Sequence, residues 1–421
     1  MIKLLAIWII CNLPLTVANP RSPTDTLPDV GNIMAGLTPE STPGDFRRLA
    51  EHLGRLNTSL QSPELHLYAT LMHARAGDEA AAGKALAQAI AAGMQNPDVL
   101  DLDPQLVLLR KSPNYPALRQ SLDSIRRRVS NPDRFTVDTR ALDRLTGIMD
   151  TPGYRAADRS ELLSKFVVAG SPGLRDFYLN SYKRTGDMDR IFRQRDTTYR
   201  TLAHLYRNGT YDDLAHRVRE GIDRFAAAYE GGTFPTVYLL PGVFRSGGTA
   251  SNTGLLIGAE TFIGDLPAGR VPTAGYTDSL LDGMSHTIVH ELMHFQQRYA
   301  GADPGTVLYK VIEEGAATFL TTLFMEGDTT RINSPFLRKR GNLDRVLARF
   351  RTELYGTDTG EWVYNEGSPD WPRDIGYELG AELCRSFYLR AGDKQAALRT
   401  LLTSESLTDI IAGSDYSHVL R

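Results

Sequence analysis

Only two cysteines, Cys11 and Cys384, occur in the 421 residues, so a scaffold held together by disulfides is excluded. The charges nearly balance, with 50 Asp and Glu against 47 Lys and Arg, which leaves no cationic excess for nucleic acid or an anionic membrane surface. After residue 18, no apolar run approaches the roughly 20 residues of a membrane-spanning helix. We therefore expect a folded globular chain that binds a small molecule or a protein chain.

The N-terminus has the pattern of a targeting segment. Lys3 precedes a mostly apolar stretch at residues 4–17, and the small residue Ala18 offers a cleavage point. This order predicts a secretory signal peptide at residues 1–18 and a secreted or periplasmic protein. A buried N-terminal helix or an uncleaved anchor is the alternative.

Composition divides the rest of the chain into three parts. Residues 19–44 are rich in Pro, Ser, Thr and Asp and predict an exposed linker. Residues 45–130 carry apolar residues at helical spacing and predict an all-helical module. The pattern breaks at Ser130-Asn131-Pro132, so residues 131–421 are expected to form a second domain.

Part of the helical module resembles the closing part of a tetratricopeptide-type repeat. The resemblance covers about 45 residues and rests on Ala76-Gly77-Asp78-Glu79-Ala80, Ala89-Ile90-Ala91-Ala92-Gly93, Asp101-Leu102-Asp103-Pro104, Leu109-Arg110 and Tyr115. Such helix pairs stack into concave surfaces that bind proteins, which implies a protein partner at this module. A simple helical cap on the domain at 131–421 is the alternative.

The domain at 131–421 is expected to place two strands ahead of its two longest C-terminal helices. Two β-like runs, at 236–240 and 253–258, flank a Gly-rich and Ser-rich segment and predict two strands joined by a loop. Helices are predicted at 140–150, 158–168, 197–229, 280–299, closed by Gly301, and 307–324, closed by Gly327. A further helical stretch at 378–391 holds Cys384 among apolar residues, which favours a packed thiol over a catalytic one.

His290-Glu291-Leu292-Met293-His294 places two imidazoles one helical turn apart on the same face. In this arrangement the two histidines hold one zinc ion, and the glutamate between them takes a proton from a metal-activated water. His286 lies one turn earlier, but it is about 12 Å along the axis from His294, too far for both to bind one ion. We assign His286 a capping or supporting role instead.

A third ligand must come from elsewhere, and Glu313 and Glu314 lie on the next predicted helix. The segment Glu314-Gly315-Ala316-Ala317 resembles the Glu-Gly-x-Ala pattern of gluzincin peptidases, in which the glutamate before glycine is the ligand. This resemblance favours Glu314 over Glu313. The small residues that follow are expected to let this helix approach the histidine helix closely, and Thr318 is a candidate to orient a ligand.

Peptide hydrolysis also needs a donor for the oxyanion and a place for the substrate chain. Tyr377 is our candidate donor, with Arg373 and His418 as alternatives. An extended substrate is expected to pair with an edge strand near Leu255, Leu256 and Ile257, unless these residues form an ordinary core strand.

A wider resemblance covers about residues 135–403. This segment resembles a family of bacterial domains described as predicted zinc-dependent proteases. The likeness rests on the two metal motifs together with Gly247-Gly248-Thr249, Leu256-Ile257-Gly258-Ala259-Glu260 and Gly376-Tyr377-Glu378-Leu379-Gly380. It implies an α+β, zincin-like domain with a small antiparallel or mixed sheet.

The expected function is therefore zinc-dependent hydrolysis of peptide bonds, with Glu291 as general base and one zinc on His290, His294 and Glu314. Two alternatives stay open. One is a helical-repeat protein-binding factor with a structural or degenerate zinc site, and the other is a zinc hydrolase of non-peptide amides or esters.

Overall fold

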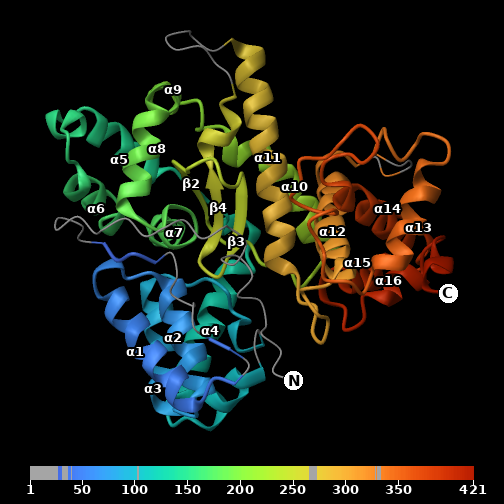
Figure 1. Ribbon diagram of the computed structural model, residues 1–421, viewed down its shortest axis with the longest axis horizontal. Helices are drawn as coiled ribbons and strands as arrows, with labels where there is room; N and C mark the ends of the chain where they lie inside the picture. Colours follow the sequence, from blue (N-terminus) through green and yellow to red (C-terminus); the bar gives the residue numbers. More distant parts are fainter. Residues whose placement is uncertain are drawn as a thin grey trace. The chain divides into compact units, whose positions relative to one another are not determined.

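The computed structural model describes residues 27–30, 37–38, 40–101, 104–264, 273–327, 329 and 333–421. The predicted signal peptide at 1–18, with Cys11, lies outside them. Helices dominate the described residues, and four strands form one small mixed sheet, so the chain is α+β as predicted (Figure 1). None of the described helices combines the length and the apolar character needed to cross a membrane.

The described chain forms two compact units. The first takes the described part of Ile7–Arg217 together with Thr233–Ile288, and the second takes Val218–Gly232 and Val289–Arg421. Two helices, α10 (Leu214–Ala228) and α11 (Ala274–Gln296), begin in the first unit and end in the second. Each unit is described separately below.

The first unit contains helices α1 to α9, short turns of 3-10 helix and one π-helical segment. The α-helices are α1 (Pro43–Leu60), α2 (Pro63–Arg75), α3 (Glu79–Ala92), α4 (Tyr115–Val129), α5 (Arg140–Met149), α6 (Ser160–Val168), α7 (Pro172–Phe177), α8 (Thr185–Gln194) and α9 (Asp196–Arg207). The short elements are η1 (Val99–Asp101), η2 (Pro104–Lys111), η3 (Pro132–Arg134), η4 (Pro152–Arg155), η5 (Tyr178–Tyr182, the π-helix) and η6 (Ala259–Phe262). The helix predicted at 197–229 is two helices, α9 and α10, because Gly209 turns the chain at a φ of 70°.

The sheet has the strand order β1-β2-β4-β3. Its strands are β1 (Val137–Asp138), β2 (Val237–Leu240), β3 (Gly248–Ser251) and β4 (Gly254–Gly258). Strand β4 pairs in parallel with β2 on one side and antiparallel with β3 on the other. Leu255, Leu256 and Ile257 therefore lie on a central strand with no free edge, and the expectation that a substrate pairs with them is wrong. The segment predicted as a loop supplies β3, which occupies that edge.

The helical segment 45–130 and the sheet belong to the same compact unit, and this unit extends well past residue 130. Buried and partly buried hydrogen bonds join the two parts. The Glu64 carboxylate accepts from the Asn252 backbone at 2.7 Å, and the Gln95 side chain accepts from the Thr236 backbone at 3.0 Å. The fully buried Asp176 accepts from Ser62 at 2.6 Å. Because buried polar groups need partners, these bonds fix the helices to the strands.

Leu27 and Val30 are buried and Pro28 and Asp29 are partly buried, which corrects the prediction of an exposed segment at these four residues. Leu27 and Val30 are 4% and 0% exposed, and the Val30 backbone donates to the Lys183 carbonyl at 3.0 Å. Asp29 forms an ion pair with Arg184 at 2.8 Å. Two apolar side chains in a Pro-rich stretch are enough to hold it against the helices.

The second unit contains α12 (Val307–Met325), α13 (Asn342–Glu353), α14 (Ile375–Arg390), α15 (Lys394–Thr403), α16 (Thr408–Ala412) and η7 (Ser417–Leu420), together with the end of α11 (Figure 1). Helix α12 matches the predicted 307–324, and α11 begins six residues before the predicted start at 280. Cys384 is fully buried in α14, as a packed thiol should be. Burial also raises the pKa of its thiol.

Helices α12 and α14 cross at a pair of glycines, Gly315 and Gly380. A Cβ atom at Gly315 would lie 2.1 Å from the Gly380 carbonyl carbon, and one at Gly380 would lie 1.8 Å from the Val311 oxygen. The glycine after Glu314 therefore serves the approach of α14, not the approach to the histidine helix that the sequence suggested. The reason is geometric, since Gly315 is one residue round the helix from Glu314 and faces a different neighbour.

Candidate metal centre

Helix α11 places His290 and His294 on one face, one turn apart. Their Nε2 atoms lie 3.0 Å from each other, and the two ring centroids are 4.6 Å apart. The side chains are 19% and 16% exposed, so both rings are largely shielded from water. Two imidazole nitrogens thus converge on one point at the edge of the helix.

Helix α12 brings Glu314 to the same point. Its Oε2 atom lies 3.1 Å from His294 Nε2 and 3.3 Å from His290 Nε2, and its side chain is 5% exposed. Glu313 points elsewhere and forms an ion pair with Lys310 at 2.6 Å. The structure therefore brings Glu314, not Glu313, to the histidines, and the ligand atoms of the three residues all lie within 4.8 Å of one another.

The electrostatics of this group favour a bound cation. Burial opposes ionisation of the Glu314 carboxyl, but the His294 and His290 rings outweigh burial and hold the pKa of Glu314 well below its usual value. Burial also disfavours the charged His294 ring, yet the Glu314 carboxylate raises the pKa of His294 to about 10. In the absence of a metal, the proton on His294 balances the Glu314 charge. Two imidazoles with one carboxylate are a donor set that suits zinc once that proton is displaced.

Gln297 fixes the orientation of His294. The Gln297 Oε1 atom lies 2.7 Å from His294 Nδ1, while its Nε2 donates to the Glu313 carbonyl at 2.7 Å and to the Tyr299 hydroxyl at 3.1 Å. Because these two acceptors hold the amide nitrogen, the amide oxygen faces the ring and calls for a hydrogen on Nδ1. With one hydrogen held on Nδ1, loss of the second hydrogen from Nε2 exposes the lone pair that can bind a metal.

Sequence reasoning missed Gln297, although its signal was present. The residue follows His294 by three positions, a spacing that brings side chains together at the end of a helix. Thr318, which the sequence suggested as the residue that orients a ligand, instead lines a cavity farther along α12. His286 bonds to the Asp282 carbonyl one turn earlier, with its Nδ1 at 2.9 Å from that oxygen.

Tyr364 reaches the site from the loop between α13 and α14, where its hydroxyl donates to Glu314 Oε1. This leaves Glu314 Oε2 facing the histidines. Tyr364 has a φ of 60°, a strained value for a residue with a side chain. Reciprocal bonds of 3.2 Å between Asn365 and Asp374 close the loop around it. No sequence signal could have identified Tyr364, because only the tertiary fold brings it to Glu314, fifty positions away.

Tyr377, the predicted oxyanion donor, lies against the histidines. Its ring stacks on His290 with centroids 6.1 Å apart and planes 16° apart, and it meets Tyr364 edge-on at 6.2 Å. Burial and the nearby Glu314 carboxylate both raise the pKa of Tyr377, so its hydroxyl stays protonated at neutral pH and can donate. The crossing of α12 and α14 at Gly380, one turn later, fixes its position.

The alternative donors lie in other settings. Arg373 is exposed and pairs with Asp374 at 3.2 Å, and His418 is exposed in η7. Among the described residues, neither is recorded in contact with the three ligands. Glu291 is buried, with 8% of its surface exposed, and its carboxylate is close enough to His294 to help raise the pKa of that ring. The predicted base therefore belongs to the same electrostatic group as the ligands.

Comparison of the chain with protein-family models, curated proteins and solved structures finds no match. The chemistry of the site is therefore inferred from its own residues.

Proposed function

We propose that this chain is a zinc-dependent hydrolase of peptide bonds, with one zinc ion held by His290, His294 and Glu314. The observation that carries the proposal is the convergence of two imidazole nitrogens and one carboxylate oxygen in a shielded group. Ligand sets with three protein side chains are typical of catalytic zinc, whereas structural zinc takes four. A zinc ion bound there supplies Lewis acidity and makes a water molecule more acidic.

The chain's own groups would then handle the protons. Glu291 lies between the two ligand histidines and is buried, so its carboxylate is shielded from solvent. It would accept a proton from the attacking water and return it to the leaving amine. Tyr377, kept protonated by burial, would donate a hydrogen bond to the oxygen that gains negative charge.

Tyr364 and Gln297 would hold the ligands in place. Tyr364 occupies one oxygen of Glu314, and Gln297 sets the hydrogen of His294 on Nδ1. Both bonds restrict the ligand atoms before a metal arrives, which is how supporting residues raise metal affinity.

Peptide as the substrate is supported by the resemblance of both metal motifs to gluzincin peptidases. The proposed location is secreted or periplasmic, on the basis of the N-terminal targeting pattern. Residues 45–130 are proposed as the surface for a protein partner, on the resemblance to tetratricopeptide-type repeats.

The test uses Glu291→Gln, which removes the base but keeps the size and the polar character of the side chain. The wild-type protein should bind one zinc per chain and digest a denatured protein, and a chelator should stop the digestion. The variant should keep its zinc and lose at least a hundredfold in rate. A wild type that purifies without metal and binds none, or a variant that digests at the wild-type rate, would refute the proposal. Turnover of small amides with no peptide cleavage would move the substrate to another class.

A further inference from the structure

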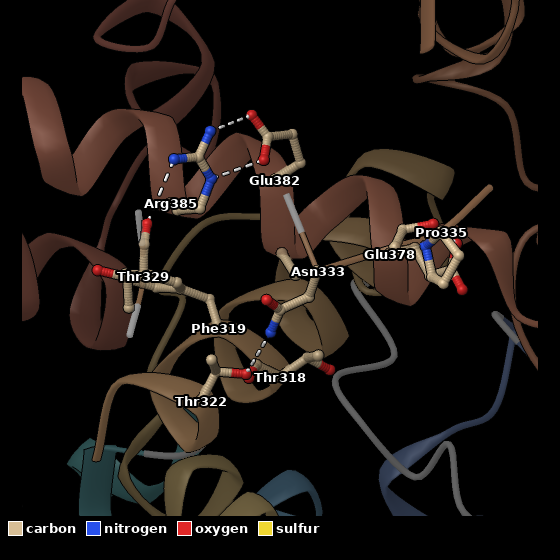
Figure 2. Close-up of a pocket in the computed structure, with 11 residues that line it drawn as sticks. Thr318, Phe319, Thr322, Thr329, Asn333, Pro335, Glu378, Glu382 and Arg385 are labelled. Carbon is tan, nitrogen blue, oxygen red and sulfur yellow. Dashed lines mark hydrogen bonds and ion pairs between the residues drawn. The ribbon is translucent and has the colours of Figure 1, made fainter. Parts of the chain in front are cut away.

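A cavity of about 200 Å³ lies between helices α12 and α14 in the second unit. Figure 2 shows its wall, to which α12 contributes Thr318 and Thr322 and α14 contributes Glu378, Ala381, Glu382 and Arg385.

The cavity continues the face of α12 that carries Glu314 and the face of α14 that carries Tyr377. On α12, Thr318 follows Glu314 by four residues, and on α14, Ala381 follows Tyr377 by four. Residues four apart lie on the same helix face, one turn or about 5.4 Å along the axis. Each helix therefore presents a residue of the site and then, one turn farther on, a residue of the cavity. The cavity wall therefore begins about one helical turn from Glu314 and from Tyr377.

Among the described residues of the wall, Glu382 and Arg385 neutralise each other. Arg385 binds both oxygens of Glu382, at 2.7 and 2.8 Å (Figure 2). The Tyr416 hydroxyl also donates to Glu382, at 2.6 Å. Glu382 is 1% exposed and Arg385 is 17% exposed, so this pair is a fixed part of the wall.

Glu378 is the remaining charge. It lies apart from the Glu382–Arg385 pair, toward Pro335, and accepts a hydrogen bond from the neutral hydroxyl of Ser334. Among the residues that the structure describes, no lysine or arginine is recorded as an ion-pair partner of Glu378. The charged groups of the described wall therefore sum to one negative charge, while Phe319, Pro335 and Ala381 give apolar surface.

We propose that this cavity binds the side chain of a lysine or arginine that flanks the cleaved bond, with Glu378 as the group that selects the positive charge. The inference rests on the proposed peptidase function. Lysine and arginine combine an apolar stem with a charged end, which matches an apolar wall that ends in a carboxylate. A charge-assisted hydrogen bond in a shielded space is strong enough to discriminate between side chains.

The binding test avoids turnover by using the full chain with Glu291→Gln, loaded with zinc. Two peptides are compared that are identical except for the residue beside the central bond, which is lysine in one and norleucine in the other. The two side chains have similar apolar stems, and only lysine carries a charge. Lysine should bind about tenfold tighter or more, the effect of one hydrogen bond to a charged group. Adding Glu378→Gln, which can still accept from Ser334, should bring the ratio to about one. Glu405→Gln removes an exposed carboxylate of the same unit and is the matched control, with no change in the ratio.

A peptide-library digest with the wild type separates this inference from the function it rests on. If the wild type cleaves beside lysine and arginine and Glu378→Gln cleaves without this preference, the result supports both the role of the cavity and the peptidase function. Zinc-dependent cleavage without that preference, or with a preference that Glu378→Gln leaves intact, refutes the cavity's role and leaves the peptidase standing. Lysine-selective binding without any cleavage supports the cavity and refutes the peptidase. Equal binding of both peptides, together with no cleavage, refutes both.

Discussion

Gly380→Ala tests whether the glycine crossing of α12 and α14 holds the second unit together. An alanine Cβ would lie 1.8 Å from the Val311 carbonyl oxygen, so the helices must separate by about 1.6 Å to reach the 3.4 Å of an ordinary contact. Alanine is the better helix former by about 1 kcal/mol, which alone would stabilise α14. Overpacking costs about 1–3 kcal/mol or more, and here the obstacle is backbone, which has no rotamer to change. We expect a net loss of about 2 kcal/mol.

The assay is urea unfolding followed by tryptophan fluorescence, on the chain without residues 1–18. Of the three tryptophans, Trp8 is then absent, and Trp362 and Trp371 both lie in the second unit. With a slope of about 2 kcal/mol per molar urea, the midpoint should fall by about 1 M. The same shift of α14 would carry Tyr377 away from His290 and lower the hydrolytic rate.

Gly54→Ala is the matched control, because a Cβ at this position in the interior of α1 meets nothing within 4 Å. It belongs to the first unit and should leave the tryptophan transition unchanged, with a small gain in stability by circular dichroism. If Gly380→Ala unfolds at the wild-type urea concentration or above it, the steric account of the crossing is refuted.

Three further predictions concern the metal centre. Gln297→Leu removes the acceptor for His294 Nδ1 and should weaken zinc binding about 10- to 100-fold in a chelator competition. Gln297→Glu keeps that acceptor and should lose less zinc affinity. Equal zinc affinity in Gln297→Leu and wild type would contradict the orienting role. The Glu314 carboxylate raises the pKa of His294 to about 10 in the metal-free protein, so zinc must displace a proton from His294 below that pH. The apparent zinc affinity should therefore rise up to about tenfold per pH unit between pH 6 and 8. A zinc affinity that stays constant over this range would argue against the coupling of zinc binding to loss of the His294 proton. Tyr377→Phe removes the proposed oxyanion donor and should lower kcat about 100-fold or more with little change in KM. If only KM changes in Tyr377→Phe, then Tyr377 binds substrate without stabilising the transition state.

Local patterns in the chain were enough to predict much of the helical framework. The spacing of apolar residues located α5 and α6 and marked 45–130, which holds α1 to α4, as helical. Gly327 marked the end of α12 because the chain there needs a φ of 78°. The extent of the helix predicted at 197–229 was less well predicted, since Gly209 inside it turns the chain. Helices α7, α8, α13, α15 and α16 were not anticipated. They are short, and short segments depend on tertiary packing more than on their own propensity.

The sheet shows where local patterns end. Residues 237–240 and 254–258 carry apolar runs that predict strands, but their parallel pairing and the insertion of β3 at the edge depend on contacts between distant segments. The burial of residues 27–30 has the same origin. Leu27 and Val30 are two apolar positions in a polar stretch, and only the folded helices offer them a surface.

The sequence by itself determined the two histidines and the glutamate between them as one group, because the 3.6-residue period of a helix brings positions four apart onto one face. The tertiary structure decided the rest. It brought Glu314 rather than Glu313 to the histidines, placed Tyr364 on the far oxygen of Glu314, and turned Gly315 toward α14. These are contacts between helices and loops far apart in the chain, and they depend on how side chains of different elements fill the same space.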